Sequence, residues 1–226
     1  MIDDLGDLYR ADHGWITIQS EALDTGAALD LLKQGAIDLA CVSWLPADLD
    51  AAYWRSALAQ DAVAVIVNPA NPVTGLSLAQ LRDVFQGRVL DWSALGWTNE
   101  NLIVVSREGG SGTRAVFEAA VMEGRAVTPN AVVQPDSDAV VNVVARTPGA
   151  IGYVSRARVT HSVKPIAIEG VEPGPVTVAN GTYPIGRVLF VVARSEPQGA
   201  VREFVAWLLG LEGQQAIAER GFGRVK

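Results

Sequence analysis

The sequence is poor in cysteine, in histidine and in positive charge. Its single cysteine, Cys41, excludes an internal disulfide and any multi-cysteine metal site. The two histidines, His13 and His161, leave few ligands for a zinc ion. Acidic residues outnumber basic residues by 25 to 18, which gives a net charge of −7. This balance argues against a nucleic-acid backbone or an anionic membrane as the main partner, because both attract basic proteins.

Long hydrophobic runs are missing as well. No apolar stretch approaches the roughly 20 residues that a membrane-spanning helix needs. Met1 is followed by Ile2-Asp3-Asp4 rather than by a basic segment, so we expect no export signal in the chain as given. The 226 residues, of which 49% are hydrophobic and 19% charged, predict a folded globular protein. This length fits one large domain or two small lobes.

Strand and helix patterns alternate along the first third of the sequence. The apolar run Ile37–Val42 is typical of a strand buried on both faces, with Cys41 as a small apolar core residue. The βαβα order implies a mainly parallel sheet covered by helices, an α/β fold. The expected elements are a helix over 2–9, a strand at Trp15–Gln19, a helix over Ala27–Gln34 opened by Asp24-Thr25-Gly26, the strand Ile37–Val42, a helix over Leu49–Gln60 and a strand at Ala62–Val67.

The same alternation continues through the rest of the chain. Ser77-Leu78-Ala79-Gln80 is a capping box, which predicts a helix from there to about Gly87. The other expected elements are strands at 102–106, 131–134, 150–154, 163–168 and 188–193, and helices at 113–122, 138–146 and 198–220.

Two polar breaks interrupt this alternation. Asn68–Pro72 holds two prolines and two asparagines in five residues, which favours an extended crossing segment. A second break runs from Ser155 to Thr160. Two crossings predict two lobes, residues 1–68 with 156–226 and residues 69–155, so that the chain returns to its first lobe. Ligands of such folds bind at the carboxyl ends of the strands.

The segment Leu102–Arg114 is the best candidate for a binding site. A buried strand leads into a glycine-rich turn with two hydroxyls, and a helix follows directly. Free N–H groups at a helix start, beside Ser111 and Thr113, form an anion site. Arg107 adds a planar fork that matches a tetrahedral oxyanion. A capped turn whose glycines only permit close packing gives the same pattern, and both interpretations stay open.

The same turn also partly matches enzyme motifs. Gly110–Ala115 satisfies the G-x-G-x-x-A dinucleotide pattern, but no clear acidic residue ends the next strand at the ribose-binding distance. The phosphate-binding Walker pattern fails because no lysine precedes Thr113, and the nucleophile-elbow pattern fails at the same residue. A dinucleotide-dependent enzyme therefore remains as the weaker alternative.

Several motifs together show a resemblance to a known family. The sequence resembles the phosphate-binding proteins of bacterial ABC transporters, within the wider class of two-lobed periplasmic substrate-binding proteins. The resemblance runs from about residue 24 to the C-terminus. The matching stretches, in order, are Leu76–Gly87 with Asp91–Ser93, Val105–Arg107 with Ser111–Arg114, Thr147–Tyr153, Tyr183–Arg187 and Glu212–Gln214.

The resemblance implies a set of ligand-binding residues and a fold. The fold is the type II periplasmic-binding-protein fold, with mainly parallel sheets and two hinge crossings. The implied residues are Arg107, Ser111, Gly112 and Thr113 from one lobe and Thr25 from the other, where it stands at the turn that opens a helix.

The sequence departs from the family at three places. Ser43 replaces the family's phosphate-specific aspartate, and Trp44, which follows it, is a candidate to line the cleft. Gly109 stands where the family has the acid that orients the arginine, so only Glu108 can take that part. The family's first strand and its ligand-binding loop do not occur before the first helix.

These observations predict a protein that captures a small tetrahedral oxyanion, most simply phosphate, in a cleft between lobes without chemistry. The resemblance implies no cofactor, an ABC-transporter permease as partner and a periplasmic or extracellular location. Without the first strand, we expect phosphate binding weaker than micromolar and self-association through an uncovered sheet. The alternative of the same fold is a sensor or scaffold domain that has lost its ligand.

Overall fold

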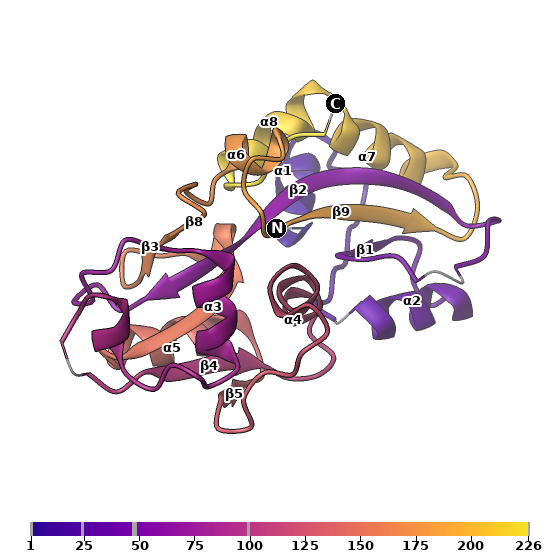
Figure 1. The fold of residues 1–226 in the computed structure, drawn as a ribbon. Helices are drawn as coiled ribbons and strands as arrows, with labels where there is room; N and C mark the ends of the chain where they lie inside the picture. The colour runs from indigo at the N-terminus through magenta and orange to yellow at the C-terminus, as the bar shows by residue number, and fades with distance from the viewer. Residues whose placement is uncertain (1, 24, 47–48, 99, 226) are drawn as a thin grey trace. The chain divides into compact units, whose positions relative to one another are not determined.

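The computed structural model describes residues 2–23, 25–46, 49–98 and 100–225, which form two compact units (Figure 1). Unit 1 contains residues up to Gln60 together with Val188 and the residues after it, and unit 2 runs from Asp61 to Arg187. The chain therefore leaves unit 1 and returns to it. The expected lobe boundaries depend on two polar breaks, and both breaks lie inside unit 2. They are Asn68–Pro72 and Ser155–Thr160.

Unit 1 is built from three strands and four helices among its described residues. The strands lie in the order β1 (Ala40–Val42), β9 (Gly186–Ala193) and β2 (Trp54–Val67), and β1 pairs with β9 in antiparallel fashion. Helices α7 (Gly199–Leu209) and α8 (Leu211–Glu219) lie on one side of these strands and α2 (Thr25–Gln34) on the other (Figure 1).

Apolar side chains hold the helices of unit 1 in place. Leu29 and Leu32 of α2 pack against Val42 and Val192 of the strands. Helix α1 (Ile2–Asp12) contributes Tyr9, whose ring lies 5.1 Å from that of Phe204 and 5.3 Å from that of Trp207 on α7. Helices α1 and α7 therefore pack their apolar side chains against each other, as amphipathic helices do.

The predicted helix over Leu49–Gln60 is wrong, because Trp54–Gln60 is the first half of the 14-residue strand β2. Four alanines in this segment favour a helix. Strand pairing outweighs that preference: Gln60 exchanges two backbone hydrogen bonds with Gly223, at 2.8 and 2.7 Å. The amide of Gln214 also donates to the carbonyl of Leu58 at 3.0 Å.

Two predicted strands in unit 1 also need correction. Trp15–Gln19 shows the expected alternation of exposure, with Trp15 65% exposed, but it forms no strand because no described segment pairs with its backbone. The strand expected at Ile37–Val42 is only three residues long. Ala40 and Val42 pack against α2 and are buried, while Cys41 points to the opposite face and is exposed, contrary to the prediction of burial on both faces.

Unit 2 has a mixed sheet with a parallel centre. The second half of β2 pairs antiparallel with β6 (Ala150–Ser155) and with β7 (Lys164–Pro165). Strand β4 (Ile103–Arg107) pairs parallel with β6 on one side and with β5 (Val132–Gln134) on the other. Two short strands, β3 (Gly75–Leu76) and β8 (Ala167–Ile168), form a separate parallel pair. The predicted α/β class is confirmed.

The helices of unit 2 follow the sequence predictions closely. The predicted capping box is present: the Ser77 hydroxyl accepts from Gln80 N–H, the Gln80 side chain accepts from Ser77 N–H, and α3 (Leu78–Phe85) follows. Helix α5 covers Ser137–Arg146, and α4 (Gly112–Phe117) continues directly into a π-helical turn, η2 (Glu118–Met122). The remaining short helices are η1 (Trp92–Leu95), η3 (Arg156–Arg158) and α6 (Pro175–Ala179).

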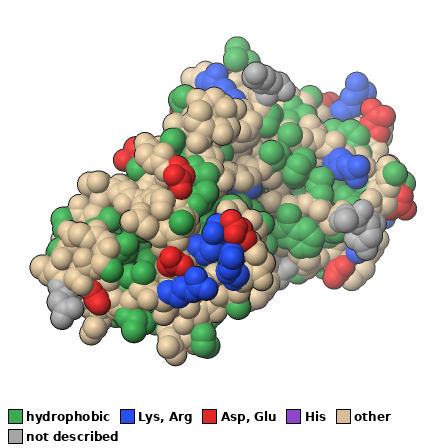
Figure 2. Space-filling model, in the orientation of Figure 1, with side chains coloured by type: hydrophobic (Ala, Val, Ile, Leu, Met, Phe, Trp, Pro, Cys, Tyr) green, Lys and Arg blue, Asp and Glu red, His purple; other side chains and the backbone are tan. Residues whose placement is uncertain are grey.

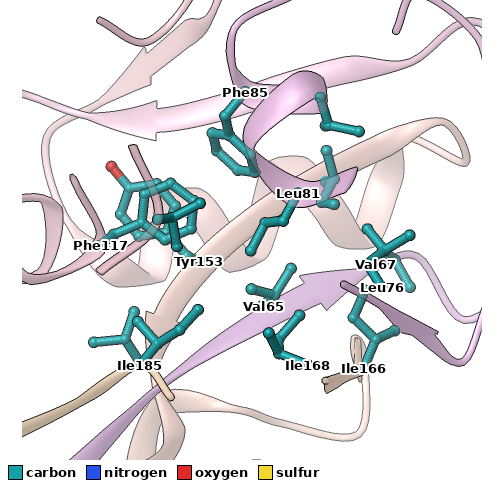
Figure 3. Close-up of a cluster of buried hydrophobic side chains, with 14 of the residues drawn as sticks. Val65, Val67, Leu76, Leu81, Phe85, Phe117, Tyr153, Ile166, Ile168 and Ile185 are labelled. Carbon is teal, nitrogen blue, oxygen red and sulfur yellow. The ribbon is translucent and has the colours of Figure 1, made fainter. Parts of the chain in front are cut away.

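The two faces of this sheet carry different helices. Val65 and Val67 of β2 belong to a core cluster with Leu81 and Phe85 of α3, as Figure 3 shows. Successive side chains of a strand point to opposite faces. The residue between the two valines, Ile66, accordingly packs with the valines of α5 on the other face.

An aromatic stack joins α4 to the sheet. The ring of Phe117 lies flat on that of Tyr153 in β6, with ring centres 4.1 Å apart and an interplanar angle of 6° (Figure 3). Both side chains are at most 1% exposed. Burial of two aromatic rings fixes α4 firmly against the sheet, and this contact positions the loop that precedes α4.

Candidate anion-binding site

The candidate site lies where the parallel strands β4 and β5 end. Arg107, the last residue of β4, is opposite Gln134, the last residue of β5. A four-residue loop leads from Arg107 to α4, and Pro135 and Asp136 lead from β5 to α5. Since the carboxyl ends of adjacent parallel strands meet at one sheet edge, both helix starts face the same edge.

The start of α4 presents unused hydrogen-bond donors. Ser111 caps the helix, because its hydroxyl accepts from the N–H of Arg114 at 3.3 Å. Its own N–H donates to the carbonyl of Glu108 at 3.2 Å. Among the described residues, nothing accepts from the N–H groups of Gly112 and Thr113. Two amides at a helix start, beside the 7% exposed Thr113, form a site that favours an anion.

Arg107 supplies the positive charge, and its side chain is only 12% exposed. Its Nε and Nη2 donate to the two carboxylate oxygens of Glu108 at 3.2 and 2.7 Å. Nη2 also donates to the Pro135 carbonyl at 3.0 Å, and Nη1 to the Ser137 hydroxyl at 3.4 Å. Glu108 therefore orients the guanidinium, which is the role that the sequence analysis expected of it.

This pairing changes the acidity of Glu108. Burial acts to raise the pKa of the Glu108 carboxyl, but hydrogen bonds from the Arg107 side chain and from its own backbone N–H act the other way. The net result is a pKa below the ordinary value of 4.5. Glu108 is consequently ionised at neutral pH, so the Arg107 side chain is oriented by a charged partner.

The structure adds two supporting residues that sequence reasoning missed. Arg114 donates from Nη1 to the backbone carbonyl of Arg107 at 2.7 Å and from Nε to Glu118 at 2.7 Å. The hydroxyl of Tyr153 lies 2.9 Å from that of Ser106 and accepts from the N–H of Arg107 at 3.4 Å. Both therefore fix the backbone of Arg107. The sequence does contain a signal for the bond between Arg114 and Glu118, because residues four apart on a helix lie next to each other.

The predicted residues of unit 1 lie together. The hydroxyl oxygens of Thr25 and Ser43 are 3.4 Å apart, and the N–H of Ser43 donates to the Thr25 hydroxyl at 3.4 Å. Thr25 is 7% exposed and is the first residue of α2. Asp24, predicted to open this helix with Thr25, lies outside the described residues. Trp44, the candidate cleft residue after Ser43, is 39% exposed.

Within the described ranges, no three His, Cys, Asp or Glu side chains are grouped so that they would hold a metal ion. No helix among these residues is both long and apolar enough to cross a membrane.

Comparison with known families places the chain in a class. Residues 1–212 match the family model described as the PBP superfamily domain, so the chain belongs to that superfamily of periplasmic-type binding proteins. The phosphate-binding protein PstS of Bacillus subtilis is 31% identical over 206 residues, which are 88% of this chain and 68% of that protein. Within the superfamily, the chain is a member of the phosphate-binding family of ABC-transporter substrate-binding proteins.

Solved structures agree with this assignment. A Clostridium perfringens structure, assigned as a phosphate ABC transporter substrate-binding protein and solved with bound phosphate, has a TM-score of 0.92 at 28% identity. The alignment covers 99% of this chain and 94% of that one. An ABC-type phosphate transport receptor from Vibrio cholerae has a TM-score of 0.82 at 29% identity, with 99% and 95% covered. The predicted type II fold and the resemblance are thereby confirmed, and the family is not an enzyme family.

Proposed function

We propose that this chain binds inorganic phosphate and delivers it to an ABC-transporter permease. The observation that carries the proposal is the start of α4, where the N–H groups of Gly112 and Thr113 have no acceptor among the described residues and where a four-residue loop leads back to Arg107, whose side chain is 12% exposed. The name of the Bacillus subtilis relative, and the phosphate in the Clostridium perfringens structure, agree with this ligand.

Binding of this kind needs no bond to form or break. The backbone N–H groups of Gly112 and Thr113 and the hydroxyls of Ser111 and Thr113 donate to the oxygens of the anion, and Arg107 balances its charge. The helix backbone fixes the N–H groups, and Glu108 fixes the guanidinium. Few side chains therefore have to be ordered when the ligand binds. We infer that the chain acts as a binding protein outside the cytoplasm and not as an enzyme.

We propose that Thr25 and Ser43 also donate to the anion. Their hydroxyls lie 3.4 Å apart, so one can donate to the other, and the hydroxyl that accepts still has its own proton to give to an anion. Replacing both residues by alanine should weaken phosphate binding without changing the fold. Unchanged affinity in Thr25→Ala and Ser43→Ala would remove both residues from the proposed site.

Self-association through unit 1 is a further part of the proposal. Among the described residues, β1 pairs only with β9, so its other edge is unpaired. Exposed strand edges pair readily with a second copy of the same chain. Light scattering should therefore give a mass above that of the monomer, and a clean monomer would remove this part of the proposal.

The direct test is calorimetry with phosphate, sulfate and NAD as separate ligands. Phosphate should bind, and the sequence leads us to expect a dissociation constant above the micromolar range. Binding of NAD alone would favour the dinucleotide-dependent enzyme. No binding of phosphate or sulfate would favour a domain of the same fold that has lost its ligand.

Arg107 variants locate the site. Arg107→Ala removes a charge-assisted contact and should cost about 2–5 kcal/mol of binding free energy, mostly through faster release. Arg107→Lys should also lose affinity, because the planar fork is gone. Unchanged phosphate affinity in Arg107→Ala, with an intact circular dichroism spectrum, would reject the site.

A further inference from the structure

Ser137 lies at the candidate site, and its hydroxyl does not cap its own helix. It is the first residue of α5, and the residue before it, Asp136, is the N-cap. The Asp136 carboxylate accepts from the N–H of Ala139 at 2.7 Å, which is the usual capping bond. The Ser137 hydroxyl is therefore not required to start α5.

The register of the sheet brings Ser137 beside Arg107. Because Gln134 is opposite Arg107 in the parallel β4–β5 pair, the chain after Gln134 passes the Arg107 side chain. Two contacts confirm this path. Arg107 donates to the carbonyl of Pro135 at 3.0 Å and to the hydroxyl of Ser137 at 3.4 Å.

The hydrogen bonds of Arg107 show where an anion can reach it. A guanidinium has five N–H groups. Nε and one Nη2 proton are directed to Glu108, the other Nη2 proton to Pro135 and one Nη1 proton to Ser137. The second Nη1 proton has no acceptor among the described residues, so it is the one available to an anion without breaking a contact. Ser137 lies at that same nitrogen.

The Ser137 hydroxyl is also in the right state to donate. Its oxygen accepts from Arg107, and a hydroxyl that accepts one hydrogen bond still has its own proton to give. Nearby acidic groups are already engaged: Glu108 bonds Arg107, and Asp136 caps α5. Figure 2 shows Lys and Arg side chains together with acidic ones on the surface over α4.

We propose that Ser137 is an anion-binding residue, which donates a hydrogen bond to a phosphate oxygen bound at the Nη1 side of Arg107. This inference rests on the proposed function and adds the β5–α5 junction to the site. The anion would then contact both loops that follow the parallel strands β4 and β5, rather than the loop before α4 alone.

Calorimetry on four proteins tests the proposal. Wild type, Ser137→Ala, Ser137→Thr and the control Ser162→Ala are titrated with inorganic phosphate. Ser162 is a suitable control because it lies in unit 2 and its hydroxyl contacts only Thr160, at 2.7 Å, among the described residues. Ser137→Ala should weaken binding about 10- to 100-fold, as expected for a lost bond to a charged ligand. Ser137→Thr, which keeps the hydroxyl, should recover most of the affinity.

The outcomes separate this inference from the proposed function. If wild type binds no phosphate, both fail. If wild type binds phosphate and Ser137→Ala binds as tightly as Ser162→Ala, the function stands and the role of Ser137 is rejected. A crystal structure of the wild-type complex distinguishes a direct contact from an effect through Arg107. A distance of at most about 3.2 Å between the Ser137 hydroxyl and a phosphate oxygen supports the proposal, and a longer one overturns it.

Discussion

At the scale of single residues, the site depends on neighbours that hold one guanidinium. The Arg107 guanidinium forms hydrogen bonds with Glu108 on one edge and with the β5–α5 junction on another. Arg114 and Tyr153 form hydrogen bonds with its backbone. The sequence marked Arg107 and the hydroxyl turn as candidates, because a guanidinium and two hydroxyls after a buried strand suit an anion, and the family resemblance favoured this interpretation over a plain capped turn. Tyr153 and the β5–α5 junction were not, because they reach Arg107 from strands far along the chain.

Glu108 gives a prediction about pH. Its pKa is lowered in the folded protein, so its ionised form contributes stability above the unfolded value of 4.5, and this contribution is lost as the pH falls through the lower folded value. Wild type should therefore unfold at a higher temperature than Glu108→Gln at pH 7, and the difference should shrink below about pH 4.5. Thermal unfolding from pH 7 to pH 3 measures it. A difference that stays constant over this range would contradict the assignment.

Ser43 gives a prediction about selectivity. In the proposed site, a carboxylate at this position would accept the proton of hydrogen phosphate and would repel sulfate, which has none. A hydroxyl donates as well as accepts, so it repels sulfate less. We expect weaker discrimination between phosphate and sulfate than in relatives with an aspartate, and Ser43→Asp should increase it. A competition titration that gives wild type a preference above about a thousandfold would contradict this expectation.

At the scale of elements, the sequence patterns predicted helices better than strands. A capping box or an apolar stripe is formed by residues that are close together in the sequence. Helices α3 and α5 accordingly form near their predicted positions. A strand also needs a neighbour for its backbone, which a pattern cannot supply. Trp15–Gln19 alternates as a strand should but has no described partner, whereas β2 has partners along its length and overrides the helix preference of its alanines.

The buried ion pair between β2 and β9 yields a prediction at this scale. Asp61 is fully buried and accepts from Nε and Nη2 of Arg187 at 2.9 and 2.7 Å, while Ser155 donates to its other oxygen at 2.8 Å. Arg187→Met leaves a buried carboxylate without its partner and should cost about 3–5 kcal/mol of unfolding free energy.

Denaturant unfolding measures this cost. The double variant Asp61→Asn with Arg187→Met should lose less than the sum of the two single variants, because no charge is then left buried. Arg202→Met, on the exposed surface of α7, is the control and should stay within about 0.5 kcal/mol of wild type. Additive losses in the double variant would show that the pair is not coupled.

At the scale of the whole molecule, the chain leaves unit 1 at Gln60 and returns to it at Val188. The sequence predicted a return at other residues, with lobe boundaries after residues 68 and 155, from two polar breaks and from the alternating order of elements. The breaks themselves lie within unit 2, because a chain can pass between compact units inside a regular strand, as β2 does. Proline and asparagine indicate where a helix or strand ends. They do not indicate where the contacts between two parts of the chain become few, and it is those contacts that divide the chain into two units.

The last prediction concerns the stability of the whole molecule with its ligand. A ligand that binds only the folded state stabilises it by RT ln(1 + [L]/Kd), about 2.7 kcal/mol at a concentration 100 times Kd. For a chain of this length that is a rise of about 5–10 °C in unfolding temperature. Phosphate should produce this rise in wild type, NAD should produce none, and Arg107→Ala at the same phosphate concentration should lose most of it. An equal rise in wild type and Arg107→Ala would show that phosphate acts as a general stabilising salt and not through the start of α4.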